Sequence, residues 1–392
     1  MKTIRLHPGA GRRVRAGHLW IFSNEIQGFD KTIPAGEDVL VEDHRGRLLG
    51  TGTFSPRSLI AVRLHAQGAS RELDAELLGE RTHQAWGCRK RWLGEKGSLA
   101  CRVVNAEGDF LPGLVVDRFN EYLSIQCLTA AIERRTPWIL DALEGVISPK
   151  GILLRNDSPV RALEGLSQFV SAGRGEVPSK VWFELGELRI NADLWKGQKT
   201  GFFFDQRENY RILEPLCQGG RVLDGFSYTG IWGMHAARWG ADEVLCADSS
   251  GEALELAREN AVANRLDHIQ FRQVDVLDLL KEEAEGGKGF DVIVLDPPAF
   301  ARSRHKVKEA LKGYINLNKW AMACIHPGGH LITCSCSYHV VPERFIEAIS
   351  LSAREAGRRV RILRQGSQAV DHPWIPSMPE TAYLKVLLLQ VG

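Results

Sequence analysis

The sequence predicts an α/β protein whose C-terminal part is a doubly wound open sheet, preceded by a β-rich N-terminal domain and a small central α+β domain. From about residue 219 onward, short apolar runs of the kind buried in parallel sheets alternate with helical stretches. Residues 1–68 instead contain short alternating segments interrupted by glycines, which are typical of strands joined by tight turns. Because 392 residues exceed one typical core, we predict three domains over residues 1–70, 71–178 and 179–392.

The elements of the first two domains follow from local spacing. In the N-terminal domain the segments VLVEDHRGRLLGTGTF and SLIAVRLH predict strands. Residues 72–98 have apolar side chains at helical spacing. The strand-like runs ACRVVNAEG, GLVVDRF, YLSIQCL and GILLRN come next, interrupted by a helix over 134–144. Residues 165–180 are rich in Gly, Ser and Pro and predict a linker to the last domain.

Composition narrows the class of protein. Hydrophobic residues make up 44% and charged residues 25% of the chain, and no apolar run approaches the roughly 20 residues that span a bilayer. The first residues lack the apolar segment of a signal peptide, so we expect a cytoplasmic protein without a membrane partner. The eight cysteines show no C-x-x-C pair and the twelve histidines no ligand spacing, which predicts reduced thiols and no metal site.

The C-terminal sheet is where a ligand is expected. Its strands are predicted by the runs RVLDGF, EVLCAD, IQFRQVD, FDVIVLD and HLITCSC, and open α/β sheets bind ligands beyond the carboxyl ends of such strands. The first run ends at Asp224 and continues into a turn in which Phe226, Ser227 and Gly230 let the backbone approach a ligand closely. The turn is not G-x-G-x-x-G, the dinucleotide pattern. A single carboxylate facing a cation suits the amino-acid part of S-adenosylmethionine, which has an ammonium group and no pyrophosphate.

Three further acids end the next strands of the predicted sheet. Asp248 is placed to bridge both ribose hydroxyls of the donor, Asp275 to accept a hydrogen bond from the adenine amino group, and Asp296 opens an Asp-Pro-Pro turn. An acid after a strand can also cap the helix that follows, and for any single one of these acids helix capping is the alternative to donor binding. Four acids after four consecutive strands favour a methyltransferase over a dehydrogenase.

The segment KTGFFFDQR at 199–207 precedes the first helix of this domain. Its three adjacent phenylalanines, beside Asp-Gln-Arg, would line a partly polar aromatic wall for a sulfonium ligand. A core aromatic patch is the alternative, and it is the favoured one for at least two of the three rings.

Cys336 is the candidate nucleophile. It lies at the carboxyl end of the fifth strand, opposite the Asp-Pro-Pro turn, whereas most other cysteines here suit inert core positions. Carbon 5 of cytosine is a poor nucleophile, so its methylation needs prior attack of a thiolate at carbon 6. Asp296 is the candidate for a hydrogen bond at N3, either protonated or sharing a proton with the base. The base that removes the carbon 5 proton is not assigned.

Several stretches together resemble a known family, the bacterial large-subunit ribosomal RNA cytosine-C5 methyltransferases of the RlmI type. They are GHLWIFSNEI at 17–26, NAEGDFLPGLVVDRF at 105–119, KTGFFFDQR at 199–207, FSYTG at 226–230, DVIVLDPPAF at 291–300, SCS at 335–337 and VDHP at 370–373. The resemblance covers essentially the whole chain. It implies an N-terminal PUA domain that binds RNA, a central α+β domain and a C-terminal class I methyltransferase domain.

The resemblance also assigns roles to particular residues. It places the nucleophile at Cys336 and the methyl donor against Thr200, Gly201, Asp205, Gln206, Asp224, Asp248 and Asp275. Many RNA enzymes of the wider cytosine-C5 class carry a second cysteine after the Asp-Pro-Pro motif to assist product release, but Ala299 stands here. Release therefore lacks an assigned residue, with Cys334 as a candidate substitute.

The predicted substrate is ribosomal RNA of the large subunit, naked or at an early assembly stage. Residues 1–70 carry 10 Lys and Arg against 6 Asp and Glu, a net charge of +4. The residues expected to contact RNA phosphates are Lys2, Arg5, Arg12, Arg13 and Arg15, and, after the Asp-Pro-Pro turn, Arg302, Arg304, Lys306 and Lys308. Ordinary solvated surface is the alternative for both groups. The target base is expected to be unpaired or flipped out.

Two other functions compete with cytosine methylation. The Asp-Pro-Pro motif also suits methylation of a ring or exocyclic nitrogen of guanine or adenine, which needs no thiol. A non-catalytic RNA-binding or ribosome-assembly factor could retain the same scaffold. The sequence identifies neither the modified nucleotide nor the oligomeric state, for which a homodimer is a candidate.

Overall fold

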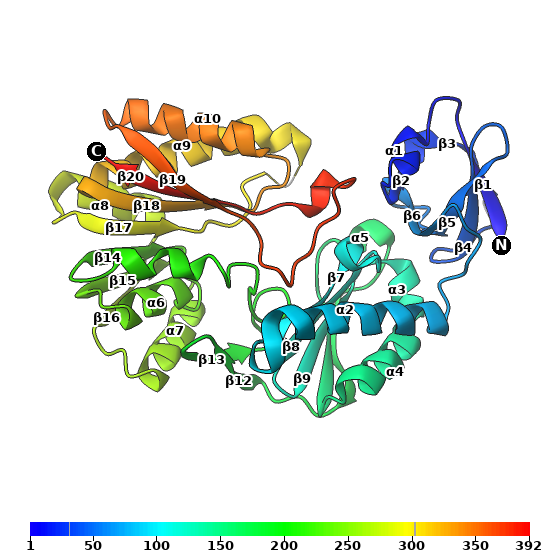
Figure 1. The fold of residues 1–392 in the computed structure, drawn as a ribbon, viewed down its shortest axis with the longest axis horizontal. Coiled ribbons are helices and arrows are strands. Elements are labelled where there is room, and N and C mark those ends of the chain that lie inside the picture. The colour runs from blue at the N-terminus through cyan, green and yellow to red at the C-terminus, as the bar shows by residue number, and fades with distance from the viewer. Residues whose placement is uncertain (31, 302) are drawn as a thin grey trace. The chain divides into compact units, whose positions relative to one another are not determined.

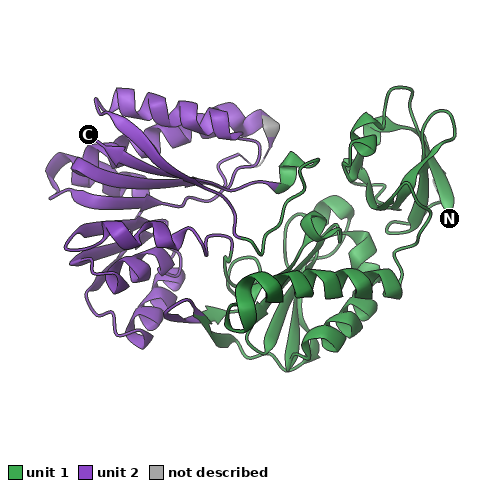
Figure 2. Ribbon diagram, in the orientation of Figure 1, with its two compact units in different colours: residues 1–184, 192–204, 370–381 green, residues 185–191, 205–369, 382–392 purple. Residues whose placement is uncertain are grey.

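The computed structural model describes residues 1–30, 32–301 and 303–392. They form two compact units, shown in green and purple in Figure 2. Unit 1 comprises residues 1–184, 192–204 and 370–381, and unit 2 comprises 185–191, 205–369 and 382–392. The chain thus passes between the units several times. Within the described ranges no helix has the length and apolar character needed to cross a membrane.

Unit 1 begins with a six-stranded sheet in the order β2-β6-β5-β4-β1-β3. Its strands are β1 (Lys2–Leu6), β2 (Trp20–Phe22), β3 (Ile26–Gly28), β4 (Asp38–Glu42), β5 (Leu48–Phe54) and β6 (Ile60–Gln67), with the short helix α1 (Arg12–Arg15). Side chains alternate between core and solvent along β4, as expected for a sheet with one buried face. The core contains Ile4, Val39, Val41 and Leu64. This is the predicted β-rich N-terminal domain.

A second sheet of unit 1 has the order β11-β10-β9-β8-β7. Its strands are β7 (Ala100–Asn105), β8 (Leu114–Phe119), β9 (Tyr122–Cys127), β10 (Gly151–Asn156) and β11 (Phe169–Gly175). Helix α2 (Ala75–Gly97) packs against β7 and against α4 (Thr136–Ile147), and Asp74 caps α2 by accepting a hydrogen bond from the amide of Leu77. The short helices α3 (Ala130–Arg134) and α5 (Arg161–Glu164) complete this part. The predicted linker over 165–180 is wrong in part, because β11 pairs along β10 there.

The C-terminal segment 370–381 belongs to unit 1, although it lies far from the rest of that unit in sequence. The Asp371 carboxylate accepts a hydrogen bond from the amide of Arg102 at 3.0 Å. The Arg89 guanidinium donates to the carbonyl of Asp371 at 2.9 Å, and the Asn105 side chain donates to the carbonyl of Pro373 at 3.0 Å. The VDHP stretch singled out in the sequence is therefore part of the packing of the central domain.

Unit 2 is built on a seven-stranded sheet in the order β16-β15-β14-β17-β18-β20-β19. Its strands are β14 (Arg221–Gly225), β15 (Glu243–Asp248), β16 (Ile269–Gln273), β17 (Phe290–Leu295), β18 (Ile325–Ser335), β19 (Val360–Gly366) and β20 (Lys385–Val391). The first five are parallel, and β20 runs antiparallel to both β18 and β19. Two short strands, β12 (Lys180–Leu185) and β13 (Leu188–Asp193), precede this sheet in the chain.

Helices cover both faces of this sheet (Figure 1). Helices α8 (Val276–Gly286), α9 (Val307–Cys324) and α10 (Pro342–Glu355) pack together on one face and share one apolar core with it. Helices α6 (Ile231–Arg238) and α7 (Gly251–Ala263) pack against β14 and β15 on the other face. The predicted doubly wound α/β fold is confirmed. Because β15 and β17 flank β14 on opposite sides, the switch point lies at the carboxyl end of β14.

Candidate active site

Asp224 stands at this switch point, near the end of β14, and its side chain is fully buried. One carboxylate oxygen, Oδ2, accepts a hydrogen bond from the amide of Gly233 in α6 at 2.8 Å. The other, Oδ1, has no hydrogen-bond partner among the described residues. Burial raises the pKa of this carboxyl to about 7, with the Gly233 amide lowering it and the charges of Asp296 and Asp248 raising it further. A buried oxygen without a partner is the feature that a ligand's ammonium group would satisfy.

The turn after β14 is held in an unusual backbone conformation. Phe226 (φ 63°), Tyr228 (φ 48°) and Gly230 (φ 77°) all lie in the left-handed region, which is uncommon for residues other than glycine. The Ser227 amide donates to the carbonyl of Ala247 at 3.0 Å, which ties the turn to β15. The hydroxyl groups of Ser227 and Thr229 are buried, with no partner among the described residues. The turn thus keeps hydroxyls available beside Asp224, as a polar ligand would require.

Asp248 and Asp275 both have local structural contacts. Asp248 accepts hydrogen bonds from the amide of Tyr228 at 2.8 Å and from the amide of Ser250 at 2.9 Å, so it fixes the turn after β14. Asp275 is exposed and caps helix α8 by accepting from the amide of Leu277 at 2.8 Å. The capping alternative therefore applies to Asp275. Each carboxylate oxygen has a second lone pair, so these contacts leave acceptor capacity for a ligand.

Gln206 and Asp296 lie in one hydrogen-bonded cluster of unit 2, and Asp205 precedes Gln206 in the chain. The Gln206 amide group donates to Asp296 Oδ2 at 2.9 Å, and the indole of Trp232 donates to the same oxygen at 3.4 Å. The Asn209 side chain donates to the Gln206 carbonyl oxygen at 2.8 Å, which fixes the direction of that amide. The hydroxyl of Tyr383 donates to Asp205 Oδ2 at 2.6 Å. Asp296 is therefore held as a hydrogen-bond acceptor directly after β17.

Cys336 lies one residue past the end of β18, in contact with the Asp-Pro-Pro turn. Its Sγ donates to the carbonyl oxygen of Pro297 at 3.7 Å, and the side chain is only partly buried. The neighbouring Ser337 hydroxyl accepts from the amide of Ala301 at 3.1 Å and contacts the hydroxyl of Tyr314 at 3.1 Å. Cys336 and the next residue, Ser337, thus both bond to residues of the segment that follows β17.

Cys334 differs from Cys336 in its surroundings. It is fully buried within β18, and burial, followed by the charge of Asp296, raises the pKa of its thiol well above the ordinary value. A buried thiol of this kind is a poor source of thiolate. The structure therefore distinguishes the two cysteines, which the sequence alone shows only as near neighbours.

Thr200 and Gly201 belong to unit 1 rather than to unit 2. The Thr200 hydroxyl donates to Asp117 Oδ2 at 2.5 Å, and Asp117 also pairs with the Arg102 guanidinium at 2.6 Å. Gly201 has φ 119°, and a side chain there would come within 2.8 Å of Leu194. Both residues therefore have a structural explanation within unit 1, and their role in donor binding remains a prediction.

The aromatic segment after Gly201 is mostly core. Phe202 and Phe204 are buried and pack against each other with ring centroids 5.0 Å apart, and both contact Phe183. Phe203 is partly buried and lies under the ammonium group of Lys199, 4.5 Å from its ring centroid. The core alternative is thus confirmed for two of the three rings.

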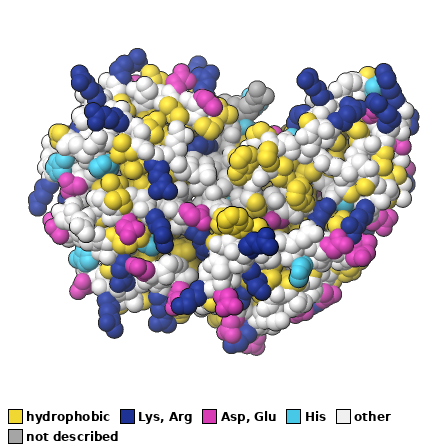
Figure 3. Space-filling model, viewed as in Figure 1, with side chains coloured by type: hydrophobic (Ala, Val, Ile, Leu, Met, Phe, Trp, Pro, Cys, Tyr) yellow, Lys and Arg dark blue, Asp and Glu magenta, His cyan; other side chains and the backbone are white. Residues whose placement is uncertain are grey.

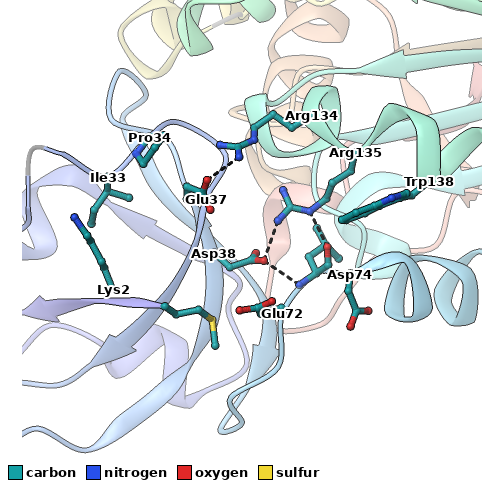
Figure 4. A pocket seen from close by; sticks show the side chains of 12 residues that line it. Lys2, Ile33, Pro34, Glu37, Asp38, Glu72, Asp74, Arg134, Arg135 and Trp138 are labelled. Atoms are coloured by element: carbon teal, nitrogen blue, oxygen red, sulfur yellow. Dashed lines mark hydrogen bonds and ion pairs between the residues drawn. The ribbon is translucent and has the colours of Figure 1, made fainter.

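The basic residues predicted to contact RNA are exposed wherever the structure describes their side chains. Four of them pair with nearby acids: Lys2 with Asp30, Arg5 with Glu42, Arg13 with Glu25 and Arg15 with Asp43. Lys2 also lines a pocket of about 630 Å³ in unit 1, together with Trp138 (Figure 4). Arg12 and Lys308 are exposed, and Lys306 pairs with Glu309 at 2.7 Å. Arg302 lies outside the described residues, as does the side chain of Arg304.

Lys and Arg side chains stand out over the N-terminal sheet in the space-filling view (Figure 3). Exposed ion pairs are weak, because water and salt screen them. The paired basic residues can therefore exchange their acidic partners for phosphates at little cost.

Comparison with known proteins now defines the class. Residues 4–67 match the model of a PUA-like domain, and residues 170–390 match that of an S-adenosylmethionine-dependent methyltransferase. The second match covers more than half of the chain. The protein is thus an S-adenosylmethionine-dependent methyltransferase with an N-terminal PUA-like domain, and the predicted class of enzyme and its methyl donor are confirmed.

Two relatives narrow this class. The chain is 37% identical to the ribosomal RNA large subunit methyltransferase I of Shewanella denitrificans and equally to that of Tolumonas auensis, over 99% of each protein. The chain belongs to the ribosomal RNA large subunit methyltransferase I family. A solved structure of a proposed SAM-dependent methyltransferase from Streptococcus mutans matches all of both chains at 20% identity with a TM-score of 0.86. A second solved structure, of a proposed methyltransferase complexed with SAH, matches equally well, and at this identity both support the fold alone.

Proposed function

We propose that this enzyme forms 5-methylcytosine in large-subunit ribosomal RNA through a covalent bond between Cys336 and carbon 6 of the base. The observation that carries the proposal is the contact of the Cys336 thiol with the Asp-Pro-Pro turn, 3.7 Å from the carbonyl oxygen of Pro297. A partly exposed thiol in contact with the turn that carries Asp296 is an arrangement that cytosine methylation needs and that nitrogen methylation does not. The names of its relatives support the RNA substrate.

The residues of the switch point would hold the methyl donor. The unpartnered oxygen of Asp224 suits the donor's ammonium group, and the hydroxyls of Ser227 and Thr229 suit its carboxylate. Asp248 and Asp275 would accept from the ribose hydroxyls and the adenine amino group. When bound, the donor supplies a methyl group activated by the adjacent sulfonium.

The chain's own residues would then act on the base. The Cys336 thiolate adds to carbon 6, which makes carbon 5 nucleophilic. Asp296, oriented by Gln206 and Trp232, would supply a proton to N3, as a protonated carboxyl or through a proton shared with the base, and so balance the negative charge that develops on the ring. After methylation a base removes the proton from carbon 5, and Cys336 leaves as a thiolate. The burial of Cys334 makes it a poor candidate for assisting this release.

The N-terminal domain, residues 1–70, would dock the RNA. Its exposed basic side chains suit contacts to phosphates, which position an enzyme without reading sequence. A central domain over 71–178 and a methyltransferase domain over 179–392 would complete the division proposed here. A large-subunit RNA substrate also agrees with the cytoplasmic location expected from the sequence.

The product identifies the chemistry. Purified enzyme is incubated with isotope-labelled S-adenosylmethionine and deproteinised ribosomal RNA from a strain that lacks this gene, and the RNA nucleosides are then separated by mass spectrometry. The proposal predicts labelled 5-methylcytidine with the wild-type enzyme and none with Cys336→Ala. Cys334→Ala is the matched control, since it removes the neighbouring thiol and should keep the product.

Other products would overturn the proposal. Labelled methylguanosine or methyladenosine would replace it with nitrogen methylation and leave Cys336 structural. No label on naked RNA and none on assembling subunits would favour the non-catalytic assembly factor.

A further inference from the structure

Lys385 is a buried lysine whose charge has no carboxylate among its described contacts. It begins β20, and only 7% of its surface is exposed. Its Nζ donates to the carbonyl oxygens of Ser337 at 2.7 Å and Tyr383 at 2.8 Å. Burying an ammonium group is costly, and an apolar side chain would fill the same space more cheaply. A lysine at this position therefore calls for a chemical explanation.

The lysine lies beside the candidate nucleophile. Strands β18 and β20 are adjacent (Figure 1), and Lys385 pairs with Ser335, one residue before Cys336. The carbonyl that Nζ binds belongs to Ser337, one residue after Cys336. Lys385 thus spans the backbone on both sides of the thiol, and its charge interacts with that of Cys336.

We propose that Lys385 is a positioning residue that holds Cys336 as a thiolate and fixes the backbone on either side of it. The inference rests on the proposed function, in which that thiolate attacks the base. Two N–H groups of Lys385 are used by the two carbonyls, which leaves one tetrahedral position on Nζ for a lone pair or a third proton. When the amine is neutral, the S–H bond of Cys336 breaks as an N–H bond forms, and the net charge of the pair does not change.

The protonation of Lys385 agrees with this role. Burial lowers the pKa of Lys385 to about 8, while the Cys336 charge raises it. The amine therefore gains or loses its proton close to neutral pH, where the thiol must ionise. Asp296 and Asp205 raise the pKa of the neighbouring Cys334 thiol, and Tyr314 interacts with the charge of Cys336.

Alkylation of the thiol tests the inference without RNA or methyl donor. Full-length enzyme is treated with iodoacetamide over pH 6 to 10, and the rate at each cysteine is read by peptide mass spectrometry. Only the thiolate reacts, so the rate follows ionisation. Cys88, which is exposed in the other unit, serves as an internal reference.

Two variants of Lys385 are expected to differ in the rate at which Cys336 is alkylated. Lys385→Met should lower the Cys336 rate at pH 7 by about 10-fold and move its profile up by about one pH unit, with Cys88 unchanged. Lys385→Arg keeps the positive charge and should restore most of the rate. Identical Cys336 profiles in the wild type and Lys385→Met would overturn the inference.

The wild-type protein gives an answer even where Lys385→Met does not fold. The inference requires Cys336 to reach half its maximal rate at a lower pH than Cys88, and a Cys336 profile at or above that of Cys88 would overturn it. Its failure is distinguishable from failure of the proposed function. The latter appears in the nucleoside products, which the alkylation experiment does not involve.

Discussion

Asp224→Asn tests whether the buried carboxylate at the switch point binds the donor's ammonium group. Without ligand, burial raises the pKa of Asp224 to about 7, so the carboxyl is largely protonated at pH 5. An ammonium partner favours the ionised form, so binding expels a proton below pH 7. A carboxyl with a pKa of about 7 is ionised in roughly 1 molecule in 100 at pH 5 and in about half at pH 7. The apparent affinity should therefore rise about 50-fold between pH 5 and pH 7 and then level off.

The assay is a fluorescence titration with S-adenosylhomocysteine at half-unit steps from pH 5 to pH 8.5. Asp224→Asn cannot ionise, so its affinity should be low and independent of pH. A ligand that keeps the adenosine but has no amino group, 5′-methylthioadenosine, is the matched control and should show no slope with the wild type. A flat profile for S-adenosylhomocysteine, or an equal slope for the control ligand, would refute the reasoning.

The Asp224 carboxyl also makes the free energy of unfolding depend on pH. Stability falls as the pH rises, whereas affinity for the ligand increases. Its folded pKa of about 7 lies above the ordinary value of 3.8, so protonation favours the folded state. The contribution to the free energy of unfolding is therefore complete below pH 3.8 and is lost as the pH rises to about 7. Donor-free enzyme should become less stable over that range, and Asp224→Asn should remove this component of the pH dependence.

Three more predictions follow from named contacts. Arg102→Leu leaves the buried carboxylate of Asp117 without its cation and should lower the free energy of unfolding by about 3–5 kcal/mol in urea titrations, and no loss would contradict the ion-pair assignment. Cys334→Ala should keep methyl transfer within about threefold of wild type while Cys336→Ala abolishes it, and equal loss would argue against a distinct role for Cys336. Arg13→Ala should weaken RNA binding by a similar factor for all sequences and reduce the salt slope by about one, and a sequence-dependent loss would contradict phosphate contact.

The parallel part of the sheet is predictable from sequence because its strands are buried on both faces. Strands β14, β15 and β17 read as short apolar runs, each with an acid at or directly after its end. Strand β19 reads differently, because most of its side chains are exposed and its sequence VRILRQG mixes polar with apolar residues. Strand β11 is hidden by its Gly and Ser content, which is typical of a linker in isolation.

The site is predictable only where its residues follow strands. Asp224, Asp296 and Cys336 are found by that rule. Trp232 and Lys385 are not found by it, because each contacts the site from far away in the sequence. Trp232 bonds to Asp296, 64 residues later, and Lys385 bonds to Ser337, 48 residues earlier. Likewise, no local pattern assigns residues 370–381 to unit 1, since that placement depends on hydrogen bonds to the central domain. Pairings of this kind are set by the tertiary fold rather than by local spacing.

The proposed reaction depends on a covalent bond between Cys336 and carbon 6 of a cytosine. A large-subunit RNA transcript made with 5-fluorocytidine tests it directly, because a fluorine at carbon 5 leaves no proton to remove and blocks release of the thiol. After incubation with enzyme and S-adenosylmethionine, we expect an RNA–protein adduct whose nucleotide-bearing peptide carries the modification on Cys336. An adduct on Cys334, or methyl transfer to unmodified RNA with no trapped adduct on the fluorinated transcript, would contradict the proposed covalent mechanism.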